Sequence, residues 1–237
     1  MRGVLGHRTR VISTKSSAVQ IWQAYCEEDG CSWKGRSFRG GVGGREAAEA
    51  EAQHHAHVLS ATRDEARSAV LATFAWTHGH ADFARVMRSP GVLRTVGDAL
   101  AKPFGNANVS AVVAPEARGF VFGALVATAM GVGLVLARKP GSVHPGAVEG
   151  ESSAPDWRGQ RVTYRIGSDA ISAGDRLLLV DDWIETGNQA RAIAALITRL
   201  GGELVGVAAV VDDTDAQTRD ELRVQGLLHS HELPADV

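Results

Sequence analysis

Cysteine and aromatic residues are scarce in this chain of 237 residues. Its two cysteines, Cys26 and Cys31, are too few for the disulfide-dense scaffold of a small secreted protein, and they favour a reducing compartment. The N-terminus also lacks the apolar core of a signal peptide, so we expect a cytoplasmic protein. Apolar residues at 44% and charged residues at 22% are ordinary for a globular enzyme.

One long uncharged run imitates a membrane span. Gly119 to Ala137 carries no charge and lies between Arg118 and Arg138. A membrane-spanning helix needs roughly 20 apolar residues. The glycines of Gly131-Val-Gly133 would interrupt such a helix near its end, so the run predicts a helix followed by a buried strand.

The net charge of −2 excludes a protein that binds nucleic acid through its overall charge. The charge is uneven, however, because residues 1–45 carry eight basic residues against three acidic ones. Residues 1–62 are therefore expected to form a small basic module, and residues 63–237 a larger domain. The module reads as short strands up to about Tyr25, a glycine-rich run and a helix over Arg45–Ala61.

Apolar runs alternate with helical stretches in the second half of the chain. Strands are predicted at Val109–Ala114, Val132–Ala137, Leu177–Val180 and Leu204–Val211. Helices are predicted between them at Phe120–Met130 and Gln189–Leu200. This alternation predicts an α/β fold with a parallel sheet covered by helices on both faces.

Two further segments are less regular. Asp64 to Phe104 reads as helical pieces, interrupted at Gly79 and at Ser89-Pro90-Gly91. Gly141 to Arg161 has no period and predicts a mobile loop near the active site.

The most informative segment runs from Leu177 to Ala190. An apolar strand leads into Asp181 and Asp182, then a Thr186-Gly187 turn, then a helix. Backbone amides at such a turn can hold a phosphate, and the two carboxylates can accept hydrogen bonds from sugar hydroxyls. The segment therefore offers binding groups for both the sugar and the phosphate of a ribose 5-phosphate. A plain buried strand with an acidic turn is the structural alternative.

A second motif follows the preceding strands. Arg118 stands at a strand-to-helix turn in Glu116-Ala-Arg-Gly119, and Arg138-Lys139 follows the next strand. These cations are expected at one edge of the sheet, where they can bind a dense anion such as pyrophosphate. A surface pair of Arg118 with Glu116 is the alternative.

Both motifs resemble those of the type I phosphoribosyltransferases, and Glu-Ala-Arg-Gly-Phe with Arg-Lys resembles the adenine phosphoribosyltransferases. The resemblance implies that the chain binds phosphoribosyl pyrophosphate (PRPP) and a purine nucleobase, uses Mg²⁺ and forms a homodimer. It places Asp181 and Asp182 on the ribose hydroxyls and the turn around the 5-phosphate. The turn residues are Glu185, Thr186, Gly187, Asn188 and Gln189. Here Asn188-Gln189 replaces the usual Gly-Thr, and the Gln189 amide is still able to donate a hydrogen bond.

The same family carries a loop Glu-Tyr-Gly whose carboxylate handles a proton of the nucleobase. With a one-residue insertion, Asp156-Trp157-Arg158-Gly159 occupies that place. Asp156 is therefore the expected general acid/base and Trp157 an aromatic cover that excludes water. A solvated loop aspartate is the alternative, and the shorter acid leaves the identity of the base open.

A zinc site is expected in the N-terminal module. Cys26 and Cys31 can supply thiolates, and His54 and His57 lie on one face of a helix. A free thiol pair or a disulfide is the alternative. One rival function is a PRPP-sensing regulator that binds nucleic acid through this module. The other is a protein-interaction module that uses zinc only for folding.

Overall fold

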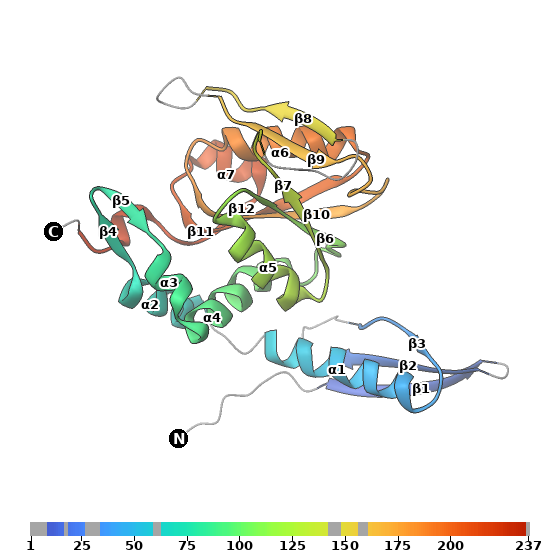
Figure 1. Cartoon of the computed structure of the whole chain (residues 1–237). Helices are drawn as coiled ribbons and strands as arrows, with labels where there is room; N and C mark the ends of the chain where they lie inside the picture. Colours follow the sequence, from blue (N-terminus) through green and yellow to red (C-terminus); the bar gives the residue numbers. More distant parts are fainter. Residues whose placement is uncertain are drawn as a thin grey trace.

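The computed structural model describes residues 9–16, 19–26, 34–58, 63–141, 148–155 and 161–235. Within them, a small N-terminal sheet with one helix is followed by a larger α/β domain (Figure 1).

Five parallel strands form the central sheet of the larger domain, in the order β12-β11-β10-β6-β7. The strands are β6 (Ala111–Pro115), β7 (Gly133–Ala137), β10 (Arg176–Ile184), β11 (Glu203–Asp212) and β12 (Val224–Leu228). The α/β fold and four of these strands are as the sequence predicts. The fifth, β12, is an edge strand whose sequence, Val-Gln-Gly-Leu-Leu, breaks the apolar run with a polar residue and a glycine.

Helices cover both faces of this sheet. α2 (Arg63–Thr73), α4 (Pro90–Ala101) and α5 (Gly119–Met130) share one core with Leu178 and Val180. α6 (Asn188–Arg199) and α7 (Ala216–Leu222) share a second core with Leu177 and Leu179. Because successive side chains of β10 enter opposite cores, its apolar run has to be continuous.

The uncharged run after Arg118 forms α5 and then β7, as predicted. α5 ends at Gly131, which adopts a left-handed conformation with φ of 66°. Across the described segments, no helix is long and apolar enough to cross a membrane.

A short hairpin replaces part of the helical region predicted at 64–104. β4 (Ala75–Thr77) pairs with β5 (His80–Asp82) in antiparallel fashion. The two turn residues between them, His78 and Gly79, have φ of 51° and 74°, the left-handed values that a tight hairpin turn requires. Gly79 therefore marks a hairpin, and not merely a break between helices. The region continues with α3 (Ala84–Arg88), α4 and the short 3-10 helix η1 (Lys102–Phe104).

Part of the loop predicted at 141–161 is a strand. β8 (Val148–Ser152) pairs with β9 (Thr163–Gly167), whose residues Tyr164 and Ile166 are fully buried. The pairing gives β8 its structure although its own sequence, Val-Glu-Gly-Glu-Ser, has little strand propensity.

The N-terminal module consists of β1 (Thr9–Ser16), β2 (Val19–Cys26), β3 (Phe38–Arg39) and α1 (Val42–Val58). Its strands form an antiparallel sheet in the order β1-β2-β3. Ala48 and Ala52 of α1 are buried together with Ala24 of β2. α1 also contacts α4 and α5 of the larger domain.

Candidate functional site

A cavity of about 480 Å³ lies where β6 and β10 end. Because these parallel strands are neighbours, the loops that follow them meet at one edge of the sheet. The structure brings together most of the residues predicted to bind substrate. Those that line the cavity are Glu116, Arg118, Lys139, Asp181, Asp182, Glu185, Thr186, Gly187, Asn188 and Gln189.

Arg138 is the predicted cation that does not line this cavity. Its backbone pairs with Arg165 of β9, with N–O distances of 2.9 and 2.7 Å. Its guanidinium lies 6.0 Å from the centre of the Phe120 ring. Lys139, the next residue, does line the cavity, and its backbone N–H donates to Glu116 Oε2 at 2.9 Å. This bond ties the loop after β7 to the loop after β6.

The two acids lie within β10, which continues to Ile184. Asp181 Oδ1 accepts a hydrogen bond from the backbone N–H of Asp182 at 2.8 Å. Burial, and then the neighbouring Asp182 carboxylate, raise the pKa of Asp181 well above its usual value. A Cβ at Gly119 would lie 3.0 Å from Asp181 Oδ1 and 2.8 Å from Pro115, so glycine at this position leaves room for the acid.

Asp182 carries the least satisfied polar atom of the site. Its side chain is only 9% exposed, and Oδ2 lies 2.8 Å from Arg118 Nε as an ion pair. Within the described ranges, however, Oδ2 accepts no hydrogen bond. A buried acceptor in this state is ready for a donor such as a sugar hydroxyl or the water of a hydrated cation.

Arg118 joins the acid pair to the β4–β5 hairpin. While Nε faces Asp182, an Nη group donates to the carbonyl of Ala81 at 3.0 Å. The guanidinium also lies 5.4 Å from the centre of the Phe83 ring. The ion pair that the structure shows for Arg118 is therefore with Asp182, whereas the alternative from sequence paired it with Glu116.

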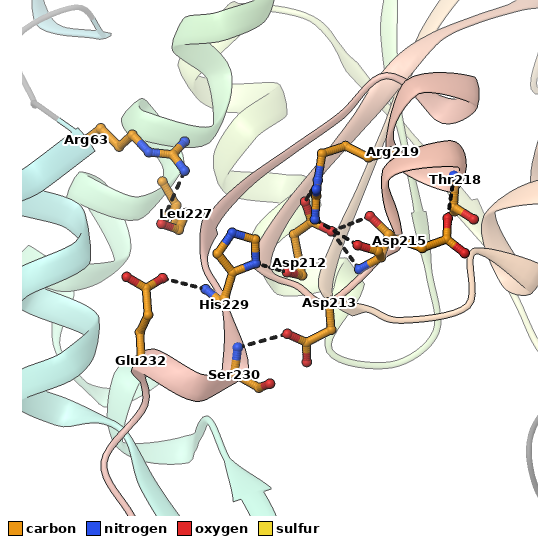
Figure 2. A network of polar contacts seen from close by, with 11 residues as sticks. Arg63, Asp212, Asp213, Asp215, Thr218, Arg219, Leu227, His229, Ser230 and Glu232 are labelled. Atoms are coloured by element: carbon orange, nitrogen blue, oxygen red, sulfur yellow. Dashed lines mark hydrogen bonds and ion pairs between the residues drawn. The ribbon is translucent and has the colours of Figure 1, made fainter.

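The C-terminal segment holds the hairpin in place. Trp76 Nε1 donates to the carbonyl of Pro234 at 2.7 Å. Arg67 of α2 forms a short ion pair with Glu232. Glu232 also accepts a hydrogen bond from the backbone N–H of His229 at 2.8 Å (Figure 2). The hydrogen bonds from Arg67 and His229 lower the pKa of Glu232 to about 2. The hairpin carbonyl that holds Arg118 is therefore supported from outside the cavity.

A second set of polar contacts fixes the end of β11, as Figure 2 shows. Arg219 donates to Asp212 Oδ2 at 2.7 Å, and Thr214 donates to Oδ1. Burial would raise the pKa of Asp212, but these hydrogen bonds outweigh it and lower the pKa. Asp213 accepts from the backbone N–H of Ser230 at 2.9 Å, which anchors the C-terminal segment to β11.

The turn between β10 and α6 has the geometry of an anion site. Gly187 is the N-cap of α6 and has φ of 71°. A Cβ there would lie 2.6 Å from Thr218, so both the conformation and the space require glycine. Arg191 donates to the carbonyl of Thr186 at 2.8 Å and holds the turn from within α6. Backbone amides at this helix N-terminus can therefore bind a phosphate.

Two neighbours of the turn come from the β8–β9 hairpin. Tyr164 is fully buried and its hydroxyl donates to Gln189 Oε1 in a short hydrogen bond. Burial, followed by the nearby acids, raises the pKa of Tyr164. Asn188 Nδ2 donates to the carbonyl of Pro155 at 3.0 Å. Pro155, which follows β8, thus lies next to the phosphate turn.

Asp156 and Trp157 lie outside the described residues, directly after this contact. The side chains of the predicted zinc ligands, Cys26, Cys31, His54 and His57, lie outside them as well. Where side chains are described, no group of three or more His, Cys, Asp or Glu residues is placed to hold a metal ion. The zinc site stays a prediction.

Sequence reasoning missed two aromatic residues at the site. The first is Trp183, which lines the cavity next to Ile184 and meets Trp76 edge-on with ring centres 6.2 Å apart. The second is Tyr164, which orients Gln189, as described above. Aromatic residues are scarce in this chain, so a tryptophan directly after the acid pair was a signal that Trp183 belongs to the site.

Comparison with known proteins agrees with this geometry. The family described as phosphoribosyl transferase domain matches residues 84–227. An adenine phosphoribosyltransferase of Methylococcus capsulatus is 38% identical over 151 residues, which cover 62% of this chain and 86% of that protein. Another, of Methylobacillus flagellatus, is 41% identical over 145 residues, covering 61% and 81%.

Solved structures match as well. The crystal structure of adenine phosphoribosyltransferase from Rhodothermus marinus superposes with a TM-score of 0.62 at 30% identity, covering 70% of this chain and 99% of that one. The Saccharomyces cerevisiae enzyme, solved with an iminoaltritol bisphosphate and adenine, gives 0.60 at 27% identity with the same coverage.

Proposed function

Since the chain belongs to the phosphoribosyl transferase domain family, we propose that it transfers the ribose 5-phosphate of PRPP to adenine, forming adenosine monophosphate and pyrophosphate. The observation that carries the proposal is the cavity at the ends of β6 and β10. It combines a buried acid pair, a glycine turn at a helix N-terminus and two cations. The curated relatives named above supply the choice of adenine.

The sugar phosphate is held by two elements. The amides of Glu185 to Gln189 bind the 5-phosphate, supported by the dipole of α6. Asp181 and Asp182 accept hydrogen bonds from the ribose hydroxyls. Oδ2 of Asp182, which pairs with Arg118 but accepts no hydrogen bond among the described residues, is suited to this role. Binding at both ends fixes C1 of the ribose for attack.

Transfer breaks the bond between C1 and the pyrophosphate oxygen and forms a bond between C1 and a nitrogen of the base. The ribose carries positive charge in the transition state, next to two carboxylates. Pyrophosphate takes the bonding electron pair and is stabilised by Arg118 and Lys139. The attacking base loses a proton, which Asp156 accepts. Pro155, the residue before Asp156, accepts a hydrogen bond from Asn188 of the phosphate turn, which supports this role for Asp156.

Mg²⁺ fits the residues present, because magnesium is usually held by one or two carboxylates together with substrate phosphates. Asp181 and Asp182 offer such carboxylates, one of them with an unsatisfied oxygen. When bound, the cation neutralises charge on the pyrophosphate.

Arg118→Ala and Lys139→Ala should each weaken binding of PRPP and pyrophosphate about tenfold or more, because each removes a charged donor. Binding of ribose 5-phosphate, measured by calorimetry in parallel, should change much less. Arg94→Ala, an exposed arginine on α4, is the matched control. Equal losses for ribose 5-phosphate would show that these cations do not hold the leaving group.

The N-terminal module, residues 1–62, is proposed as a separate domain that holds about one zinc ion per chain. Cys26 stands at the end of β2, and β2 packs against α1, which carries His54 and His57. Metal analysis of gently purified protein should find zinc in the wild type and in the control His80→Ala, but not in Cys26→Ser. Zinc retained in Cys26→Ser would contradict the site.

We also propose a cytoplasmic homodimer.

A further inference from the structure

The N-terminal sheet has one face covered by α1 and one face that α1 leaves open. Ala24 is fully buried against α1, and a Cβ at Gly44 of α1 would lie 3.2 Å from the Trp22 ring. Trp22 and Ala24 therefore face the helix. Alternate residues of a strand face opposite sides, so Ile21, Gln23 and Tyr25 lie on the other face.

The strand register identifies the rest of this open face. Residues directly opposite each other in an antiparallel pair share a face. Arg10, Ile12 and Thr14 of β1 lie opposite Tyr25, Gln23 and Ile21 of β2, respectively. Arg39 of β3 lies opposite Ile21, and Lys34 bridges to Tyr25. We call these residues, with Val19, the open face.

The charged residues that the structure describes on the open face all have one sign. Arg10, Lys34 and Arg39 are exposed, and no acidic residue belongs to the open face as defined. The acidic residues that the structure describes in this module lie on α1, behind the sheet. Two of them pair with arginines, Glu51 with Arg36 at 2.9 Å and Glu49 with Arg45 at 2.6 Å. A polyanion complements such a surface.

The same face offers an aromatic platform and apolar area. The Tyr25 hydroxyl donates to Gln23 Oε1 at 2.8 Å, which lays the ring along the sheet. Lys34 Nζ lies 5.5 Å from the ring centre. Ile12 and Val19 are 37% and 42% exposed, so this face carries apolar as well as charged area. Because Lys34 lies over the Tyr25 ring, a planar base can stack there by displacing the ammonium group, which then binds the phosphate. Exposed isoleucine and valine suit unpaired bases better than a duplex.

We propose that the open face binds single-stranded nucleic acid, with the phosphates on Arg10, Lys34 and Arg39 and a base on Tyr25. This binding is independent of the phosphoribosyl transfer proposed for the cavity, because none of these residues lines the cavity.

The test uses the full-length protein and fluorescence anisotropy with a 20-nucleotide oligo(U), an oligo(dT) and a duplex of equal length. Both single strands should bind better than the duplex. Raising salt from about 50 to 200 mM should weaken binding roughly tenfold to twentyfold if three phosphates are contacted. Equal binding of the duplex, or no binding of either single strand at the lower salt, would overturn the proposal.

Variants locate the surface. Lys34→Gln with Arg39→Gln should weaken binding and flatten the salt dependence, and Tyr25→Leu should weaken it about tenfold at unchanged salt dependence. The control is Arg85→Gln with Arg88→Gln, two exposed arginines on α3, and it should bind as the wild type does. Circular dichroism checks the fold of each variant, and pyrophosphate release should be the same in all. Loss of oligonucleotide binding in the α3 control but not in the open-face variants would refute the assignment. So would concentration-dependent self-association that the open-face variants abolish without any oligonucleotide binding.

Discussion

Replacing Asp181 and Asp182 together by asparagine should reduce PRPP affinity by about 100-fold to 10 000-fold. A hydrogen bond to a charged group contributes roughly 1.5–3 kcal/mol, and the variant weakens two of them at the ribose hydroxyls. Calorimetry with PRPP measures the loss. Asp220→Asn, which removes one exposed acid on α7, should leave binding unchanged.

The same double variant should not be less stable than the wild type. Burial and the neighbouring carboxylate raise the pKa of Asp181, so its negative charge costs free energy in the empty fold. Asparagine keeps the shape and removes that charge. An equal or higher melting temperature together with lost binding would assign the acids to function. Wild-type affinity for PRPP in the variant would remove them from the site.

Gly187→Ala should lower turnover about 100-fold. The residue has φ of 71°, a conformation that costs a side-chain-bearing residue about 1–2 kcal/mol. The new methyl group would also lie 2.6 Å from Thr218 and 3.0 Å from Leu222, so the turn has to move. A shift of about 1 Å in a group that positions substrate is enough for a loss of this size.

Gly91→Ala is the matched control for this change. Gly91 lies near the start of α4, no atom comes within 4 Å of a Cβ built on it, and no left-handed φ constrains it. Alanine there should keep full turnover and stabilise the helix by up to about 1 kcal/mol. Steady-state rates and ribose 5-phosphate affinity should fall together in Gly187→Ala only. Full activity of Gly187→Ala would show that the turn does not hold the phosphate.

The parts of the site that local sequence encodes were predictable. The acid pair, the glycine turn and the start of α6 are contiguous, so one strand-turn-helix pattern contains them all. The position of Lys139 followed from the rule that loops after parallel strands meet at one edge. The central strands were predictable because burial on both faces leaves continuous apolar runs.

Contacts between distant segments were not predictable in the same way. Arg118 faces Asp182, 64 residues later in the chain, and its second partner is a backbone carbonyl of the hairpin, which carries no sequence signal. The hairpin itself has strands of only three residues, too short for a period. β8 depends on pairing with β9, and Tyr164 reaches Gln189 only through that hairpin.

Product identification from adenine and PRPP tests the central claim most directly. Wild-type protein with Mg²⁺ should convert them to adenosine monophosphate, identified by mass, with one pyrophosphate released for each nucleotide formed. The variant with both Asp181→Asn and Asp182→Asn should form none above the background without protein. If the wild-type protein binds PRPP but transfers its ribose 5-phosphate to neither adenine, hypoxanthine nor guanine, the assignment as a purine phosphoribosyltransferase is contradicted.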